Sequence, residues 1–208
     1  MERFYSLVFV AGVGCFAVAF LLSMIFPWMS LYSYHGMDYR TIEQLAAKPS
    51  AEFVELAEKF PASFEASYGQ VTPASYAVAL QRGRDVYVGQ ACWHCHSQYV
   101  RVVSNESERW GPPSNAQEYQ NALNQPHLWG TRRVGPDLAR EGGRRTNDWH
   151  IAHFLNPKSV SPTSVMPQYT IYFDDKGVPN ADGMALIAYI QWLGTVNAGI
   201  PVGERSTP

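Results

Sequence analysis

The sequence predicts a mainly α protein, in which one N-terminal transmembrane helix is followed by a helical domain. The first observation is an uncharged apolar run, Leu7 to Phe26, which at about 1.5 Å per residue can cross the roughly 30 Å hydrocarbon layer of a bilayer. The second is a pair of segments, near residues 72–87 and 182–193, in which apolar side chains recur at helical spacing. A chain of 208 residues suffices for one such domain and an appendage.

Charge and cysteine content exclude several classes of protein. The net charge of −2 leaves no strongly basic footprint, so no nucleic acid is expected as a partner. The chain has three cysteines, and two of them, Cys92 and Cys95, belong to a motif described below. No disulfide framework is therefore expected. Cys15 lies in the apolar run and is read as a small buried or lipid-facing residue, with lipid attachment as the alternative.

Residues 1–34 form the predicted membrane anchor, which spans the bilayer over about residues 7–28. The apolar run exceeds the roughly 7–15 residues of a signal-peptide core and lacks a small-residue cleavage site, which favours a retained anchor in contact with membrane lipid. Arg3 precedes the run, which predicts a cytoplasmic N-terminus. An aromatic belt follows it, formed by Trp28, Tyr32 and Tyr34. Gly12 and Gly14 allow a neighbouring helix to approach closely, although a lipid-facing anchor remains the alternative.

Residues 35–71 are predicted to be an acidic connector with one short amphipathic helix. Pro49 suits a first helical position, and Pro61 ends the pattern. The apolar residues between them fall on one face: Phe53, Leu56, Ala57 and Phe60. This face packs either on the following domain or on a neighbouring protein, and the sequence leaves both possibilities open.

The segment Cys92-Trp93-His94-Cys95-His96 carries the chemistry. Two cysteines separated by two residues, with a histidine directly after the second, have the spacing at which two thioether bonds hold a haem while the imidazole reaches the iron. The motif occurs once, which predicts one covalently attached haem c. A thiol redox pair would need a βαβ context that is missing. A zinc site would need further ligands, for which His127, His150 and His153 are the candidates.

Residues 72–196 are the predicted mono-haem domain, with a cytochrome c-type helical fold. Thr72 and Pro73 begin a helix. One face of this helix carries Tyr76, Leu80, Gly83 and Tyr87. Its expected partner is the segment 182–193, with a stripe of Leu186, Tyr189, Ile190 and Leu193 and a stop at Gly194. Gly83 lets the helices cross closely under Tyr189 or Trp192, and Tyr87 is predicted to line the haem pocket.

A loop-rich insertion over residues 101–134 is expected to add little core. Its Trp110, Tyr119 and Trp129 are available to cover a haem edge. Beyond it, the carbonyl of Pro136 is predicted to accept the outer N–H of His96, the alternative being an ordinary Gly-Pro turn. One or two nearby arginines are predicted to contact haem propionates or an adjacent subunit, and Arg132 and Arg133 are the candidates. The alternative is that these arginines only solvate the surface. The full set is Arg132, Arg133, Arg140, Arg144 and Arg145.

The sixth ligand decides what the haem can do, because a thioether there closes the coordination shell and leaves electron transfer as its task. Met166 is the candidate, since Pro167 forces an extended backbone after it and Pro162 stiffens the approach. Met184 lies in the first turn of the last helix and is better explained by packing. A bis-histidine haem using His127, His150 or His153 is the alternative.

Several segments together resemble the membrane-anchored mono-haem cytochrome c subunit (subunit II) of cbb3-type haem-copper oxidases. The likeness covers roughly Arg82 to Tyr169 and the anchor. It rests on residues 92–101, on Arg109-Trp110-Gly111, on residues 130–143, which contain GTRRVGPDLAREGG, on Asp148-Trp149-His150, and on residues 164–169, which contain SVMPQY.

The resemblance implies a non-catalytic electron-transfer subunit with His96 and Met166 as axial ligands. Its implied partners are a large catalytic haem-copper membrane subunit and, as electron donor, a further cytochrome c subunit or a soluble cytochrome c. The implied location is the bacterial cytoplasmic membrane, with the haem domain on the periplasmic side. A nitric oxide reductase small subunit and a free-standing anchored shuttle are the alternatives. The tail, residues 197–208, is predicted to be flexible.

Overall fold

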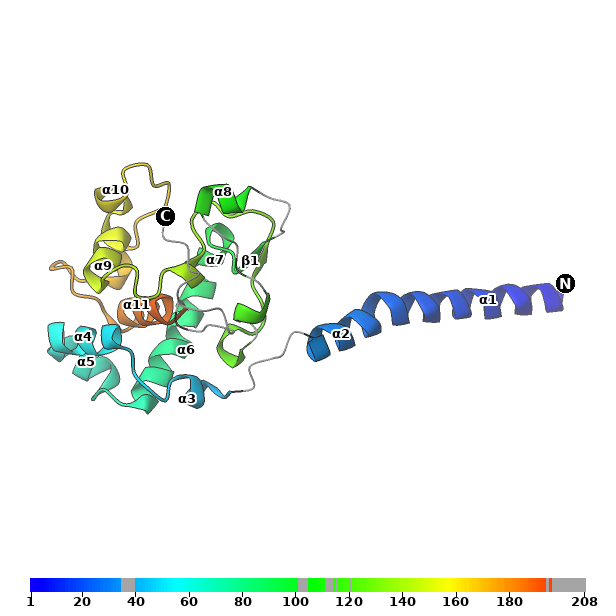
Figure 1. Cartoon of the computed structure of the whole chain (residues 1–208), viewed down its shortest axis with the longest axis horizontal. Helices are drawn as coiled ribbons and strands as arrows, with labels where there is room; N and C mark the ends of the chain where they lie inside the picture. The colour runs from blue at the N-terminus through cyan, green and yellow to red at the C-terminus, as the bar shows by residue number, and fades with distance from the viewer. Residues whose placement is uncertain are drawn as a thin grey trace. The chain divides into compact units, whose positions relative to one another are not determined.

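The computed structural model describes residues 1–34, 40–100, 105–110, 114, 116–119, 121–193 and 195 (Figure 1). It divides into an N-terminal helical unit and a second compact unit, the helical domain, whose described residues begin at Arg40. Predictions for Gly194 and for residues 197–208 lie outside the described residues.

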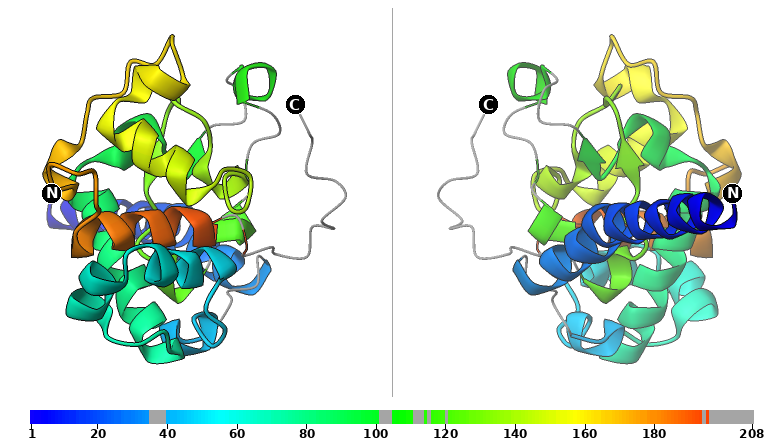
Figure 2. Two further views of the ribbon diagram at one scale, coloured as in Figure 1. Left: turned by 90° about the vertical axis from the view of Figure 1, so that its left-hand side faces the viewer. Right: turned by 90° about the vertical axis from the view of Figure 1, so that its right-hand side faces the viewer.

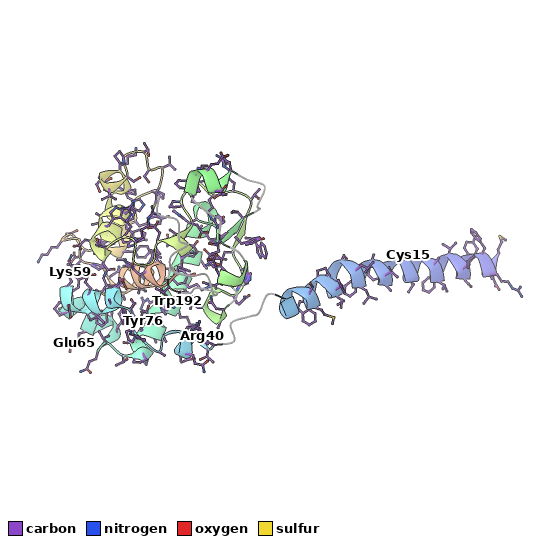
Figure 3. The ribbon with its side chains drawn as sticks, viewed as in Figure 1. Cys15, Arg40, Lys59, Glu65, Tyr76 and Trp192 are labelled. Atoms are coloured by element: carbon purple, nitrogen blue, oxygen red, sulfur yellow. The ribbon has the colours of Figure 1, made fainter. Side chains whose placement is uncertain are left out.

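The N-terminal unit is one run of helix made of α1 (Glu2–Phe20), the π-helical turn η1 (Leu21–Ile25) and α2 (Phe26–Tyr34). Residues 2–30 are long and apolar enough to cross a membrane, which confirms the predicted membrane-spanning helix. Cys15 is exposed on α1 (Figure 3). The π turn comes just before Pro27, which lacks an N–H and crowds the carbonyl four residues earlier, and the wider turn relieves this conflict.

The helical domain is organised around α6 (Pro73–Gly89) and α11 (Ala181–Leu193). Figures 1 and 2 show α11 in the middle of the domain, with α4, α5 and α6 on one side and α9 and α10 on the other. A Cβ on Gly83 would lie 2.1 Å from the Ala185 carbonyl oxygen and 2.6 Å from Cβ of Tyr189. The predicted close crossing of the two helices under Tyr189 is thus confirmed.

The last helix is buried on every side. The sequence predicts an apolar stripe on it, but each residue from Gly183 to Leu193 is buried. The predicted stripe residues are thus buried, and the other faces are buried as well because several elements surround α11, among them α6, α5, α4 and α9. Met184 is completely buried, in agreement with its predicted packing role.

The acidic segment packs onto the helical domain. It contains α3 (Ile42–Leu45), α4 (Ala51–Lys59) and α5 (Pro61–Tyr68). Phe53 is fully buried, with its ring centroid 5.0 Å from that of Phe64 and 4.8 Å from that of Tyr76 on α6. Burying a side chain of this size stabilises a fold by about 2–3 kcal/mol. The structure thereby resolves the open alternative in favour of the domain.

Local capping explains where these helices begin. Thr72 is the N-cap of α6, as the sequence predicts, and it also forms a capping box with Ser75. Ser50 caps α4 by accepting from the Phe53 amide, so Pro49 precedes the cap instead of opening the helix. Pro61 follows the end of α4 and occupies the first turn of α5, where a missing N–H costs nothing.

The remaining described elements are short. They are α7 (Cys92–Cys95), β1 (Tyr99–Val100), α8 (Glu106–Trp110), η2 (Ala116–Tyr119), η3 (Ala122–Asn124), β2 (Trp129–Gly130), η4 (Leu138–Arg140), α9 (Asn147–Leu155), α10 (Pro157–Val160) and η5 (Thr170–Tyr172). The strands β1 and β2 pair in parallel, with Tyr99 opposite Trp129. The insertion adds Tyr119, Leu123 and Leu128 to the core, so the expectation that it adds little is wrong.

Candidate haem site

A tight turn places the cysteine motif directly after α6. Gln90 ends that helix, and Ala91 has the left-handed conformation, with φ 56° and ψ 27°. This conformation costs a residue with a Cβ about 1 kcal/mol. The carbonyl of Ala91 accepts a 2.9 Å hydrogen bond from the His94 amide. The left-handed residue therefore reverses the chain so that α7 can begin immediately.

The single turn α7 carries both thiols and is followed at once by His96. Neither Cys92, which is half-buried, nor Cys95, which is exposed, forms a disulfide. The amide of His96 donates to the Cys92 carbonyl at 2.9 Å, so the histidine continues the helical turn. Burial raises the pKa of Cys92 to about 11, and a hydrogen bond with Tyr169 opposes this effect. Neither sulfur is thus committed to a covalent bond within the protein, as covalent attachment of a cofactor requires.

The imidazole of His96 is fixed through one nitrogen. Its Nδ1 lies 2.8 Å from the carbonyl oxygen of Pro136. A carbonyl only accepts, so Nδ1 carries the proton and Nε2 keeps its lone pair. Loss of hydration lowers the pKa of His96 more than the Pro136 bond raises it, which favours the neutral ring. A neutral imidazole with a free Nε2 is the form that binds iron.

The loop that supplies Pro136 closes tightly on the motif. The amides of Val134 and Gly135 donate to the Cys95 carbonyl at 2.9 and 3.0 Å. A Cβ on Gly135 would lie 2.2 Å from Cε1 of His96. Only glycine therefore fits against the ring. The Gly-Pro dipeptide is the only sequence signal for this role of Gly135, which was not predicted.

Tyr87 reaches the motif from α6. Its hydroxyl donates to the carbonyl of His96, and its side chain is fully buried. Burial raises the pKa of Tyr87 well above its usual value. The ring lies 5.6 Å from that of Tyr189 on α11. Tyr87 thus joins the helix crossing to the backbone of the candidate ligand, and its predicted contact with the haem stays a prediction.

The two candidate arginines differ sharply in environment. Arg132 is exposed, and a propionate or subunit contact there stays a prediction. Arg133 is 1% exposed, and its Nε donates to the Ser97 carbonyl at 2.6 Å. Its Nη2 donates to the Gln98 carbonyl at 3.0 Å and lies 2.8 Å from Oδ2 of Asp137. The structure therefore gives Arg133 protein partners, which the sequence does not anticipate.

The other candidate residues lie on separate elements. Met166 is half-buried and packs against the core, while its loop is tied to α9 by a 2.8 Å bond from the Tyr169 amide to the Phe154 carbonyl. Trp129 is 55% exposed, with its ring centroid 4.6 Å from that of Tyr99. The iron contact of Met166 and the haem-covering role of Trp129 stay predictions.

His150 and His153, two of the alternative iron ligands, lie on α9. His150 is 3% exposed, and its Nε2 has no hydrogen-bond partner. Burial lowers the pKa of His150 to about 4. His153 stacks on Trp149, with the ring centroids 4.6 Å apart. Across the described part of the chain, no three histidine, cysteine or acidic side chains gather to hold a metal ion among themselves.

The donor set fits a haem. Two uncommitted thiols sit on one helical turn, and the next residue offers a neutral imidazole held in one tautomer by a backbone carbonyl. Cys92 and Cys95 would hold the porphyrin, and His96 would bind the iron.

Comparison with protein-family models gives a match over residues 50–182 to the family described as cytochrome c oxidase, mono-heme subunit/FixO. The match covers more than half of the chain. The protein belongs to the FixO family. A search of curated proteins found no match.

FixO membership confirms the resemblance seen in the sequence and implies one haem and a place in a cytochrome oxidase complex with a catalytic subunit. The matched region begins at Ser50, which caps α4. It therefore includes α4 and α5, which the structure packs onto the haem domain. The sequence predicts only one helix in this segment, whereas α5 follows α4 directly after Phe60.

Proposed function

We propose that this FixO protein relays single electrons through one haem c, bound covalently to Cys92 and Cys95, to the catalytic haem-copper subunit that reduces oxygen. The observation that carries the proposal is the His96 imidazole, fixed through Nδ1 by Pro136 and adjacent to two uncommitted thiols. His96 and Met166 are the proposed axial ligands.

Each protein group has a distinct task in this relay. A haem of this kind supplies an iron that carries one electron by alternating between its ferric and ferrous states. The Pro136 carbonyl fixes the plane of the His96 ring and makes it more electron-donating. A thioether from Met166 would favour the reduced state and exclude other ligands. The packed Gly135 backbone holds the ring in place, so little rearrangement accompanies electron transfer.

The proposed relay operates at the bacterial cytoplasmic membrane. The apolar helix of residues 2–30 anchors the chain in the bacterial cytoplasmic membrane in a single pass. Arg3 near its N-terminal end supports an amino terminus in the cytoplasm and a haem domain in the periplasm. Electrons then arrive from a further cytochrome c subunit or a soluble cytochrome c.

Covalent attachment is tested by denaturing the purified full-length protein and extracting it with acidified acetone. We expect the pigment to stay with the polypeptide. Changing both Cys92 and Cys95 to serine should release it, whereas Cys15→Ser, a change of the third cysteine, should not. Pigment that leaves the unaltered protein would refute the proposal.

The axial ligands are tested by the absorption spectrum and midpoint potential of haem-loaded variants. We expect Met166→Ala to change the low-spin spectrum and to lower the potential, since a thioether ligand raises it. Met184→Ala removes a fully buried methionine and is the matched control, which should keep both. An unchanged Met166→Ala spectrum would move the ligand assignment to a histidine of α9.

The assembly is tested by metal analysis of the purified complex. An oxidase carries copper beside its catalytic haem, whereas the nitric oxide reductase alternative carries non-haem iron. FixO membership favours copper. Recovery of the protein alone after gentle solubilisation would support the free-standing shuttle instead.

A further inference from the structure

A buried ionic cluster lies beside the candidate haem ligand and has no part in the function proposed above. Its centre is Arg133, which is 1% exposed, and its two acids, Glu106 and Asp137, are 2% and 3% exposed. Nη1 of Arg133 lies 3.5 Å from Oε2 of Glu106, and Nη2 lies 2.8 Å from Oδ2 of Asp137. A charged group is buried at high cost unless it is paired, so this cluster calls for an explanation.

We infer that Arg133 and Asp137 are positioning residues that set the orientation and the electron donation of the His96 imidazole. This inference rests on the proposed haem function and goes beyond it, because neither residue touches the haem in the inferred role.

Arg133 fixes the chain on the C-terminal side of His96. The guanidinium donates from Nε to the Ser97 carbonyl at 2.6 Å and from Nη2 to the Gln98 carbonyl at 3.0 Å. These are the two residues that directly follow the histidine. Planar guanidinium donors have fixed directions, so the two bonds restrain the backbone more closely than apolar packing does.

Asp137 fixes the chain on the other side of the ring, next to the carbonyl that His96 contacts. Its Oδ1 accepts from the Tyr119 hydroxyl at 2.7 Å and from the Ala139 amide at 3.0 Å. Its Oδ2 accepts from the Ser114 hydroxyl at 2.5 Å as well as facing Arg133. The peptide between Pro136 and Asp137 is thus held by partners from several segments, and with it the oxygen that binds Nδ1.

The ion pair between Arg133 and Asp137 therefore links the two segments that hold His96 in place. Arg133 holds the residues after His96, Asp137 follows the carbonyl that orients the ring, and the two are bonded to each other. Both charges also act on His96 electrostatically. The Asp137 charge favours positive charge on the imidazole and the Arg133 charge opposes it, so the carboxylate strengthens electron donation, favours the ferric state and lowers the midpoint potential.

Two substitutions separate orientation from charge. Arg133→Lys keeps the charge but cannot reproduce the planar set of bonds, so the ring should turn. We expect a change in the electron paramagnetic resonance g-values of the ferric haem, which report the plane of the imidazole, with a smaller change in potential. Asp137→Asn keeps the shape but removes the charge, so the midpoint potential should rise.

Three further variants serve as checks. Glu106→Gln removes the same charge from the other acid paired with Arg133, which is not next to Pro136, and should raise the potential less than Asp137→Asn. Tyr119→Phe removes only one hydroxyl, leaves the Asp137 charge less neutralised and should lower the potential, so it tests the inference even where stronger changes prevent folding. Phe53→Leu weakens the core through contacts with α5 and α6 and should leave g-values and potential unchanged.

The measurements are made on the full-length protein, after covalent haem has been verified by acid-acetone extraction. Native g-values and potential in Arg133→Lys, Asp137→Asn and Tyr119→Phe would overturn the positioning roles while leaving the proposed function intact. Shifts of equal size in Phe53→Leu would also overturn them, because the cluster would then act only through stability. Absence of covalent haem in the unaltered protein would instead refute the proposed function itself.

Discussion

The two halves of the haem domain are held together by different kinds of contact. In the helical half, made of α4, α5, α6 and α11, the buried side chains are nearly all apolar or aromatic. In the loop half, residues 97–141, most of the buried side chains among the described residues are polar. They are Ser97, Gln98, Glu106, Ser114, Glu118, Asn121, Asn124, Arg133, Asp137 and Glu141.

The difference follows from how each half satisfies its backbone. Helices bond their own amides and carbonyls, so their side chains are free to be apolar. A loop lacks these bonds, and side chains such as Arg133 and Asp137 must supply the partners. Directional bonds fix atoms more closely than apolar contacts do. His96, the candidate iron ligand, lies where the two halves meet. It contacts Tyr87 of the helical half and is fixed by the Pro136 carbonyl of the loop half.

The largest expected effect comes from removing the centre of the loop half. Arg133→Met leaves Glu106 and Asp137 buried without their cation and should lower the free energy of unfolding by about 4 kcal/mol. Arg132→Met, at the exposed neighbouring position, should change it by less than about 0.5 kcal/mol. Denaturant unfolding of the two proteins measures the difference. Equal values would show that the loop half does not depend on the buried ion pairs.

The helical half should be destabilised most by a larger residue at Gly83, where α6 and α11 cross most closely. Gly83→Ala places a Cβ 2.1 Å from the Ala185 carbonyl oxygen, so the helices must separate, and we expect a loss of about 3 kcal/mol. Gly89→Ala meets nothing within 4 Å and should gain up to about 0.5 kcal/mol. The melting temperature followed by circular dichroism distinguishes them. A stable Gly83→Ala protein would contradict the tight crossing.

Low pH should destabilise the protein through His150. This side chain is buried, but unlike the buried Asp137 carboxylate of the loop half its Nε2 has no hydrogen-bond partner among the described residues. Burial lowers the pKa of His150 to about 4, below its unfolded value of about 6.5. Between these two pKa values the unfolded chain binds a proton at His150 while the folded chain does not. The free energy of unfolding therefore falls as the pH drops through this range. Between pH 6.5 and 5 we expect a loss of about 1.5 kcal/mol from this residue. Unfolding measured against pH should be flatter in His150→Gln, and an unchanged slope would refute the assignment.

The smallest effect is expected at the surface. Lys59 at the end of α4 (Figure 3) pairs with Asp148 on α9, and both side chains are well exposed. Exposed pairs contribute little because water and salt screen them, so Lys59→Met should cost at most about 0.5 kcal/mol. Repeating the unfolding experiment at high salt should abolish even this difference. A large loss would show that α9 is held on the domain by charge.

Local patterns were sufficient for several features. The uncharged run predicts the membrane-spanning helix, and the cap at Thr72 and the apolar spacing of Tyr76 and Leu80 predict α6. Gly83 predicts the close crossing with α11 because a missing side chain has an immediate steric consequence. The relationship to FixO proteins was also visible in the motifs around Cys92 and Gly135.

Other features depend on contacts between distant segments. An amphipathic pattern at Phe53 shows that α4 buries a face, but only the fold shows that Tyr76 covers it. The sequence predicts one apolar stripe for α11, although the helix is enclosed on all sides.

The sequence by itself determined the membrane-spanning helix, the relationship to FixO proteins and the principal helix pair, since each is encoded in residues close together in the chain. Only the tertiary structure decided which protein groups surround Arg133. Its sequence position suggests propionate binding, which stays a prediction, but cannot show which acceptors the fold brings to the guanidinium. For Arg133 these come from Ser97, Gln98, Glu106 and Asp137, which the fold gathers from separate segments.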